Sequence, residues 1–253
     1  MIKKIIKFFL PNFIIKIREN FLINKELKKF SNMDMKEVFS DIYQSKYWTP
    51  ELDKKNFKFY SGIGSHYDEF TKLYLEKIKE FIQTLPIKPN VVDLGCGDFK
   101  IGSSLRQFCN NYVAIDIFDE LIIWNKKEYK NLNVDFRTLD ITKDPLPSGD
   151  ICFLRQVLQH LSNKSIMSFL KLLGNKYKYL ILTEHYPEGK NLVPNIDKID
   201  GADIRLYDNS AVVLTEEPFN LKVKSKKILC EIRPKKIKNF LGTVKTHLYE
   251  LQQ

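Results

Sequence analysis

The sequence predicts an α/β fold with a seven-stranded, mostly parallel sheet, helices on both faces and a late antiparallel hairpin. Short apolar runs, typical of strands buried on both faces, alternate with segments of helical period through most of the chain. This alternation is typical of parallel sheets with crossover helices. Near the C-terminus, two segments alternate apolar with polar residues, as half-exposed antiparallel strands do. The length of 253 residues allows one large domain with a terminal extension.

The expected elements follow in chain order. Residues 68–83 have helical period, and the PIKPN row ends this helix ahead of the first strand. Buried strands are expected at 90–95, 112–116, 133–140, 150–157 and 179–185, with helices near 101–109, 119–128 and 163–174. The hairpin is expected from the alternating segments 221–232 and 243–251.

The N-terminal part precedes this rhythm, so we divide the chain into a helical extension, 1–58, and an α/β domain, 59–253. Apolar residues recur at spacings of three and four from Ile2 to Phe21, which indicates an amphipathic helix with Pro11 as a kink. Two interpretations stay open: the helix packs on its own domain or on a partner subunit, as in a homodimer, or residues 1–25 lie on an anionic membrane surface. Lys and Pro interrupt the apolar run, which excludes a signal peptide or a spanning helix. We expect a cytoplasmic protein, at most peripheral on the inner face of the membrane.

The net charge of +10 is concentrated at the two ends. Residues 1–40 carry nine Lys or Arg against four Asp or Glu, and residues 222–253 carry nine against two. The near-neutral body lacks a phosphate-tracking surface, so a nucleic acid is not the expected partner. The four cysteines show neither CxxC spacing nor pairing with His, which argues against a zinc site or a disulfide framework. We expect them to be buried in a reducing compartment.

A glycine-rich turn follows the first expected strand. In the row VVDLGCGDFK at 91–100, Asp93 is followed by Gly95 and Gly97, which let the backbone bend sharply and a ligand lie against it. In an open parallel sheet, ligands bind at the carboxyl ends of the strands. Asp116 ends the next strand, where a carboxylate is placed to accept two hydrogen bonds from ribose hydroxyls.

The turn departs from a dinucleotide-binding motif. The third glycine, Gly102, falls five residues after Gly97 rather than three, and Asp98 adds negative charge where a pyrophosphate would lie. We therefore expect a cofactor that has a nucleoside and a positive group but no phosphate.

DLGCGDFKIG followed by AIDIF resembles the cofactor-binding region of the class I S-adenosylmethionine-dependent methyltransferases, and the resemblance covers roughly residues 60–250. It implies a Rossmann-like fold, S-adenosylmethionine as cofactor and S-adenosylhomocysteine as product. The cofactor contacts that it implies are Asp93, Gly95, Gly97, Asp116, Ile117, Asp140 and Ile141.

Two further segments resemble parts of related enzymes. LRQVLQHLSN, at 154–163, resembles the segment after the fourth strand that borders both cofactor and acceptor, which implies Arg155 on the cofactor side and His160 on the acceptor side. Packing beneath the site is the other interpretation of His160. FYSGIGSHYDEF, at 59–70, resembles an N-terminal loop that closes over the cofactor, with Ser61 and Gly62 in contact; a plain glycine turn is the alternative.

Methyl transfer to a hydroxyl requires removal of its proton, by a base or with a metal. His185 is the first candidate base, with Glu184 in reserve, because carboxyl ends of central strands face the ligand cleft. His247 is expected to be an exposed strand residue. The acids show no tight spacing that supports a metal site, and metal dependence stays open.

The polar segment 191–221 follows the fifth expected strand, where the acceptor pocket is usually built. It resembles the corresponding region of bacterial surface-glycan O-methyltransferases, which implies Asn195, Asp197, Asp203 and Arg205 as acceptor-binding residues. A solvated loop held by local turns is the alternative.

The predicted function is O-methylation of a sugar or sugar-linked hydroxyl, such as a surface polysaccharide precursor, with a sugar nucleotide or glycan as partner. Two alternatives stay open. One is methylation of a lipid, quinone or other small metabolite; the other is a non-catalytic cofactor-binding partner of a membrane-associated assembly.

Overall fold

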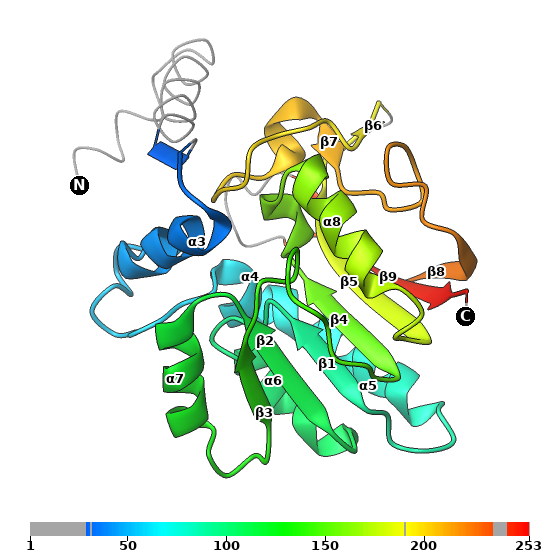
Figure 1. Cartoon of the computed structure of the whole chain (residues 1–253), viewed down its shortest axis with the longest axis horizontal. Helices are drawn as coiled ribbons and strands as arrows, with labels where there is room; N and C mark the ends of the chain where they lie inside the picture. Colours follow the sequence, from blue (N-terminus) through cyan, green and yellow to red (C-terminus); the bar gives the residue numbers. More distant parts are fainter. Residues whose placement is uncertain (1–28, 31, 190, 235–241, 253) are drawn as a thin grey trace.

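The computed structural model describes residues 29–30, 32–189, 191–234 and 242–252 (Figure 1). Its main sheet has seven strands in the order β3-β2-β1-β4-β5-β9-β8. The bounds are β1 Val91–Leu94, β2 Tyr112–Asp116, β3 Asp135–Thr138, β4 Ile151–Arg155, β5 Tyr179–Tyr186, β8 Val223–Ile232 and β9 Thr243–Leu251. Strands β1 to β5 pair in parallel, and β9 lies antiparallel to both β5 and β8. The predicted fold class is confirmed.

Helices cover both faces of this sheet (Figure 1). The described helices are α3 Met35–Gln44, α4 Ile63–His66, α5 Asp68–Gln83, α6 Lys100–Leu105, α7 Asp119–Glu128 and α8 Asn163–Leu173, with the 3-10 turns η1 Arg106–Phe108, η2 Leu158–His160 and η3 Arg205–Asp208. A short parallel pair, β6 Val193–Pro194 and β7 Ser210–Ala211, forms a separate two-stranded sheet.

The core has one large apolar cluster on each face of the sheet, because neighbouring strand residues point to opposite sides. Phe153 of β4 joins Phe70 and Ile78 of α5 in one cluster. Leu154, the next residue, joins Ile166 and others of α8 in the second. The buried clusters hold the parallel strands so that their carboxyl ends meet at one edge.

The N-terminal part is represented by α3 and the turn after it. A capping box starts this helix: the Asp34 side chain accepts from the Glu37 N–H, and Glu37 accepts from the Asp34 N–H. The Tyr43 ring stacks on Phe118 beside the carboxyl end of β2, with centroids 5.6 Å apart. The expected amphipathic helix at 1–25 lies outside the described residues, and the boundary at residue 58 stays a prediction.

Two expectations about single residue types can be compared with the structure. His247 in β9 is buried, 4% exposed, so the expectation of an exposed strand residue was wrong. It lies beside the ring of Tyr186 and packs inside the molecule. All four cysteines are free; three are buried, and Cys96 is partly buried.

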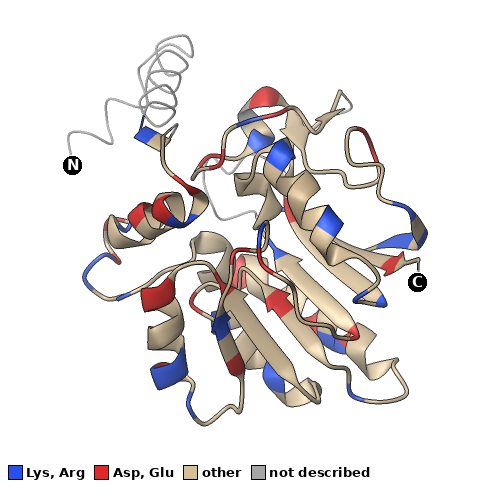
Figure 2. Cartoon of the chain, viewed as in Figure 1, with Lys and Arg blue, Asp and Glu red and all other residues tan. Residues whose placement is uncertain are grey.

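Exposed lysines lie along the edge strand β8 (Figure 2). An edge strand presents unpaired backbone groups, and lysines there oppose pairing with another chain. Within the described ranges, we find no helix that is long and apolar enough to span a membrane.

Candidate active site

The glycine turn after β1 is held against β2. The Gly95 and Cys96 N–H groups both donate to the Ile115 carbonyl oxygen, at 2.8 Å each. Gly97 has a φ of 57°, which favours glycine. A Cβ atom on Gly97 would also lie 2.2 Å from Ser61 Oγ. The turn therefore needs glycine both for its backbone conformation and for the close approach of the loop that contains Ser61.

Asp116 joins the end of β2 to this turn. Its carboxylate accepts hydrogen bonds from the Gly97 N–H at 3.0 Å and the Phe118 N–H at 3.3 Å. The side chain is buried, and burial raises its pKa to about 6. At neutral pH the group is an ionised acceptor at the floor of a cavity.

That cavity has a volume of about 480 Å³ and lies at the carboxyl ends of β1, β2, β4 and β5. Asp116, Ile117, Leu139 and Ile141 line one end, Asp93, Gly95, Arg155 and Gln156 the middle, and Met35, Phe39, Tyr43 and Trp48 come from α3 and the turn after it. We call the part bordered by Trp48, His160, His185 and residues 202–204 the acceptor end. The cavity has the size and mixed lining of a cofactor site.

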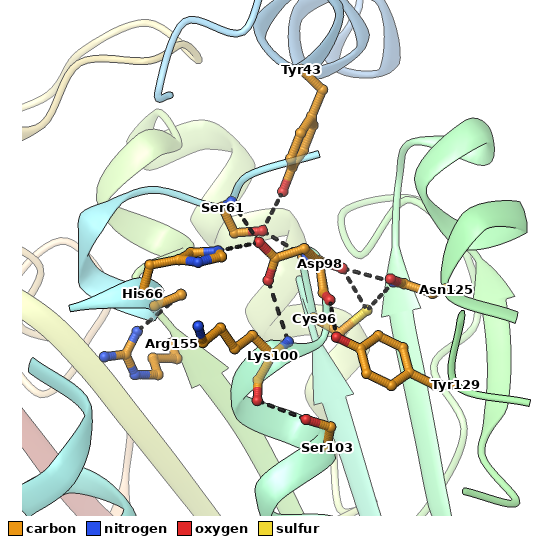
Figure 3. Close-up of polar contacts among 12 residues, drawn as sticks. Tyr43, Ser61, His66, Cys96, Asp98, Lys100, Ser103, Asn125, Tyr129 and Arg155 are labelled. Atoms are coloured by element: carbon orange, nitrogen blue, oxygen red, sulfur yellow. Dashed lines mark hydrogen bonds and ion pairs between the residues drawn. The ribbon is translucent and has the colours of Figure 1, made fainter. Parts of the chain in front are cut away.

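The loop expected to close over the cofactor is docked on the glycine turn (Figure 3). The Asp98 carboxylate accepts from the Ser61 N–H at 3.0 Å and contacts His66 Nε2 at 2.5 Å. The Asp98 N–H in turn donates to Ser61 Oγ at 2.7 Å. Asp98, expected to repel a pyrophosphate and to attract a positive group of the cofactor, also holds this loop in place.

Ser61 and Gly62 both line the cavity. Tyr43 Oη lies 3.3 Å from Ser61 Oγ, so α3 contacts the same loop from above (Figure 3). The His66 ring stacks on Tyr60, with centroids 3.9 Å apart. Sequence reasoning missed the roles of Asp98 and His66 in loop docking, because the two residues are distant in the chain.

Arg155 extends from β4 into the middle of the cavity. Its guanidinium donates to the Gly64 carbonyl at 2.6 Å and to Gln156 Oε1 at 2.9 Å, and it lies 4.8 Å from the centre of the Tyr74 ring. Burial lowers its pKa, and we find no salt bridge from it to a carboxylate in the described part of the chain. Its Nε is buried without a hydrogen-bond partner. An anionic group of a ligand would supply both the opposite charge and the hydrogen-bond acceptor that this buried guanidinium lacks.

Asp93 and Asp140 differ in their surroundings. Asp93 lines the cavity and accepts a hydrogen bond from Tyr112 Oη at 2.9 Å, and burial raises its pKa to about 7. Asp140 is not among the residues that line the cavity. Its carboxylate accepts from the Thr142 N–H at 2.9 Å, as in an Asx turn, while the neighbouring Ile141 does line the cavity.

The two candidate bases, neighbours on β5, point in opposite directions. His185 lines the acceptor end, where its Nδ1 lies 2.8 Å from Gln159 Oε1. Burial lowers its pKa to about 4, which leaves the imidazole neutral at pH 7. Glu184 is 1% exposed and accepts from the N–H groups of Leu158 at 3.0 Å and Gln159 at 3.1 Å. Glu184 thus supports η2 from outside the cavity, and burial raises its pKa to about 8.

Two of the expected acceptor-binding residues, Asn195 and Arg205, are buried in the protein, and a third, Asp197, is exposed but bonded to the backbone. Arg205, 2% exposed, donates to the carbonyls of Leu161 at 2.6 Å and Ile196 at 2.9 Å. Asn195 donates to backbone carbonyls at 2.8 and 2.9 Å, and Asp197 accepts from the N–H at the start of α8 at 2.7 Å. These side chains satisfy backbone groups of the segment and of residues 158–163, so their expected contact with an acceptor is corrected.

His160 and Asp203 do line the acceptor end. The His160 ring lies 5.0 Å from Trp48, and burial lowers its pKa to about 3. Sequence reasoning missed the contribution of α3 and Trp48. The capping box at Asp34 and Glu37 predicts a helix start but contains no information on where that helix packs. In the described ranges, no group of three or more His, Cys, Asp or Glu is arranged to hold a metal ion.

Residues 92–173 match the family model of a methyltransferase domain. A solved structure of the N-methyltransferase NodS from Bradyrhizobium japonicum WM9, in complex with S-adenosylhomocysteine, is similar with a TM-score of 0.59 and 10% identity over 84% of this chain and 100% of that chain. The structure of magnesium protoporphyrin IX methyltransferase (ChlM) from Synechocystis PCC 6803 has a TM-score of 0.55 and 14% identity, over 87% of this chain and 100% of that chain. The structure of TehB from Haemophilus influenzae has a TM-score of 0.51 and 16% identity, over 73% of this chain and 66% of that chain. Comparison with curated proteins yields no match.

The match identifies residues 92–173 as a methyltransferase domain, and the sheet around them has the Rossmann-like topology of the solved methyltransferase structures. The cofactor of this domain is S-adenosylmethionine. The predicted enzyme class and cofactor are confirmed. The glycine turn without a Cβ, the ionised Asp116 and the buried guanidinium of Arg155 suit a cofactor that carries a ribose and a carboxylate.

Proposed function

We propose that the cavity holds S-adenosylmethionine across the carboxyl ends of β2, β1 and β4. Asp116 accepts hydrogen bonds from the ribose hydroxyls, and Ile117 and Ile141 pack against the adenine. Arg155 binds the methionine carboxylate; the support is its buried position, its unpartnered Nε and the fact that no described carboxylate forms a salt bridge with it. Ser61 and Gly62 exclude water from this end, supported by the docking of their loop on Asp98.

We further propose an O-methyltransferase in which His185 removes the acceptor proton. The observation that carries this proposal is the half-buried imidazole of His185, held at the acceptor end by Gln159. Gln159 Oε1 also lies 3.3 Å from the His185 backbone N–H, so it is the accepting atom, and Nδ1 carries the ring proton. Nε2 is then the accepting nitrogen of the ring and faces the Gln156 amide nitrogen at 3.4 Å; an acceptor hydroxyl that replaces this amide can give its proton to Nε2.

The bound cofactor supplies a methyl carbon attached to a positively charged sulfur. The chain's own residues contribute alignment and proton removal. Holding the acceptor oxygen in line with the methyl carbon at about 3 Å supplies several kcal/mol of the barrier. His185 supplies the base, and Gln156, whose backbone φ is 57°, has its amide nitrogen 3.4 Å from the imidazole Nε2.

The acceptor end supports a lipid, quinone or other small metabolite better than a sugar. The case for a glycan depended on polar residues of segment 191–221, and Asn195, Asp197 and Arg205 are engaged with the backbone instead. Apolar residues from α3 and from 202–204 border the space that remains.

The test is methyl transfer from labelled S-adenosylmethionine to a panel of small hydroxyl compounds. We expect His185→Ala to lower turnover by at least roughly 100-fold, while the affinity for S-adenosylhomocysteine stays within threefold of wild type. The matched control is His247→Ala, which removes a buried histidine outside the cavity. Near-normal turnover of His185→Ala would remove His185 from the mechanism. Transfer to any acceptor excludes the non-catalytic alternative.

A further inference from the structure

We propose that the methyl acceptor is a phenol, with a planar apolar ring that packs against Trp48. This inference rests on the proposed O-methyl transfer and names the class of acceptor. It is carried by the position of Trp48, by the few polar groups at the acceptor end and by the proton chemistry of His185.

Trp48 is positioned by the turn that follows α3. Lys46 has a φ of 54°, and its ammonium donates to the carbonyls of Lys54 at 2.6 Å and Phe57 at 2.9 Å. This turn places the indole in the wall of the cavity, where it makes an edge contact with Tyr43, centroids 5.5 Å apart. Trp48 is only partly buried, so part of its surface is accessible to a ligand.

The remaining wall of the acceptor end is apolar. Leu161, Ala202 and Ile204 line the cavity together with Trp48 and Phe39, whose rings have centroids 6.2 Å apart. Offset or edge contacts of an aromatic ligand with an indole add favourable energy beyond the burial of apolar area. A flat ring therefore matches this wall better than a puckered, hydroxylated ring.

The polar groups at the acceptor end are few; most are engaged with one another, and His160 Nδ1 is buried without a hydrogen-bond partner. Gln159 Oε1 accepts from His185, and Gln159 Nε2 lies 3.3 Å from the His160 ring. A sugar has a hydroxyl on most of its carbons, and each needs a polar partner once water is removed. Besides these residues, Asp203 is the acidic side chain that borders this end. One acceptor hydroxyl can be satisfied here by His185, but a series of them cannot.

The acidity of the hydroxyl favours the same class. With a pKa of about 4, His185 is a weak base. The pKa of a phenol, near that of tyrosine at about 10, is about six units above the pKa of His185. The pKa of a hydroxyl as weakly acidic as water, about 15.7, is about twelve units above the pKa of His185. The smaller gap makes proton removal during methyl transfer far easier for a phenol.

The reaction is balanced as follows. The phenol oxygen forms a bond to the methyl carbon, and the bond from that carbon to sulfur breaks with its electron pair left on sulfur. The phenol proton goes to Nε2 of His185. The products are the aryl methyl ether, S-adenosylhomocysteine and an imidazolium, which returns its proton to water.

The test compares 2-naphthol with decahydro-2-naphthol, a ring of similar outline whose hydroxyl is not acidic, and with UDP-glucose. We measure methyl transfer by full-length protein and, by calorimetry, binding of each compound to the complex with S-adenosylhomocysteine. We expect methylation of 2-naphthol at least tenfold faster than that of decahydro-2-naphthol, and no methylation of UDP-glucose. Trp48→Leu should raise the KM for 2-naphthol about tenfold and leave the affinity for S-adenosylhomocysteine unchanged.

Trp124→Leu is the matched control, because Trp124 packs on Phe59 away from the cavity. Its KM for 2-naphthol should equal that of wild type. If UDP-glucose or decahydro-2-naphthol is methylated faster than 2-naphthol, and this depends on His185, the assignment of a phenol as acceptor is overturned. The proposed O-methyl transfer would then still stand. Failure to methylate or bind 2-naphthol by protein that binds S-adenosylhomocysteine would also overturn the assignment of a phenol. Failure to bind S-adenosylhomocysteine would instead refute the proposed cofactor site.

Discussion

Replacing Asp116 with Asn separates cofactor binding from structural support. In the protein without ligand, the buried carboxylate accepts two backbone N–H groups, and burial raises its pKa from 3.8 to about 6. A shift of about two units corresponds to about 3 kcal/mol against the ionised form at neutral pH. Asn removes this cost but leaves one N–H group without its acceptor, a loss of about 1–3 kcal/mol. The two effects nearly cancel, so we expect the melting temperature to change by only a few degrees.

The effect on the cofactor should be much larger. Hydrogen bonds to a charged group contribute about 1.5–3 kcal/mol each, and the amide keeps at most one accepting atom for the ribose. A net loss of about 3 kcal/mol corresponds to a roughly 100-fold weaker affinity. Calorimetric titration with S-adenosylhomocysteine measures this, alongside a thermal melt of each protein. Asp140→Asn is the control, because Asp140 is engaged in its own turn, and its affinity should match wild type.

The pH dependence gives an independent check. The raised pKa means that the folded protein binds more protons at Asp116 than the unfolded chain between pH 3.8 and about 6, so this group's contribution to stability falls as pH rises through that window. Cofactor affinity runs the other way, because the ribose needs the ionised form, and it should weaken as pH falls below about 6. Asp116→Asn should lose the part of this dependence that comes from Asp116. An affinity of Asp116→Asn within threefold of wild type at pH 7.5 would refute the ribose contact.

Three further outcomes are expected. Gly97→Ala places a Cβ 2.2 Å from Ser61 Oγ and should weaken S-adenosylhomocysteine at least about tenfold, with partial recovery in the double variant with Ser61→Gly; equal affinity of all three proteins would contradict the close approach. Arg205→Met should lower the free energy of unfolding in urea by about 3 kcal/mol and leave the KM for the acceptor unchanged, whereas a raised KM at full stability would return Arg205 to the acceptor site. Liposomes with acidic lipid should retain the full chain and not a chain without residues 1–25; retention of both would exclude that segment as the membrane contact.

Much of the fold was predictable because its signals are local. The helix expected at 68–83 and observed as α5 has the same bounds, since its apolar period is complete and the PIKPN row ends it. Asp116 was found because the carboxyl ends of parallel strands meet at one edge, so an acid at a strand end is near the glycine turn. Both inferences use only the order of residues along one or two elements.

The acceptor side was not predictable in this way. Arg205 and Asn195 have the residue types of a sugar site, but whether a polar side chain faces a ligand or a backbone carbonyl depends on how the segment folds back. His185 and Glu184 are neighbours, and alternation along the strand sends only one of them into the cavity. The contact of Trp48 with His160 joins positions that are more than 100 residues apart.

The sequence by itself determined the α/β class, the order of strands and helices, and the glycine turn with its paired acid, because hydrophobic period and strand-end position are properties of adjacent residues. Tertiary structure decided the rest. It closed the loop at Ser61 over the glycine turn, turned Asn195 and Arg205 inward, and placed Trp48 at the acceptor end. The physical reason is that the direction and burial of a polar or aromatic side chain depend on partners far away in the chain. A local sequence pattern does not show which distant residues become neighbours in the fold.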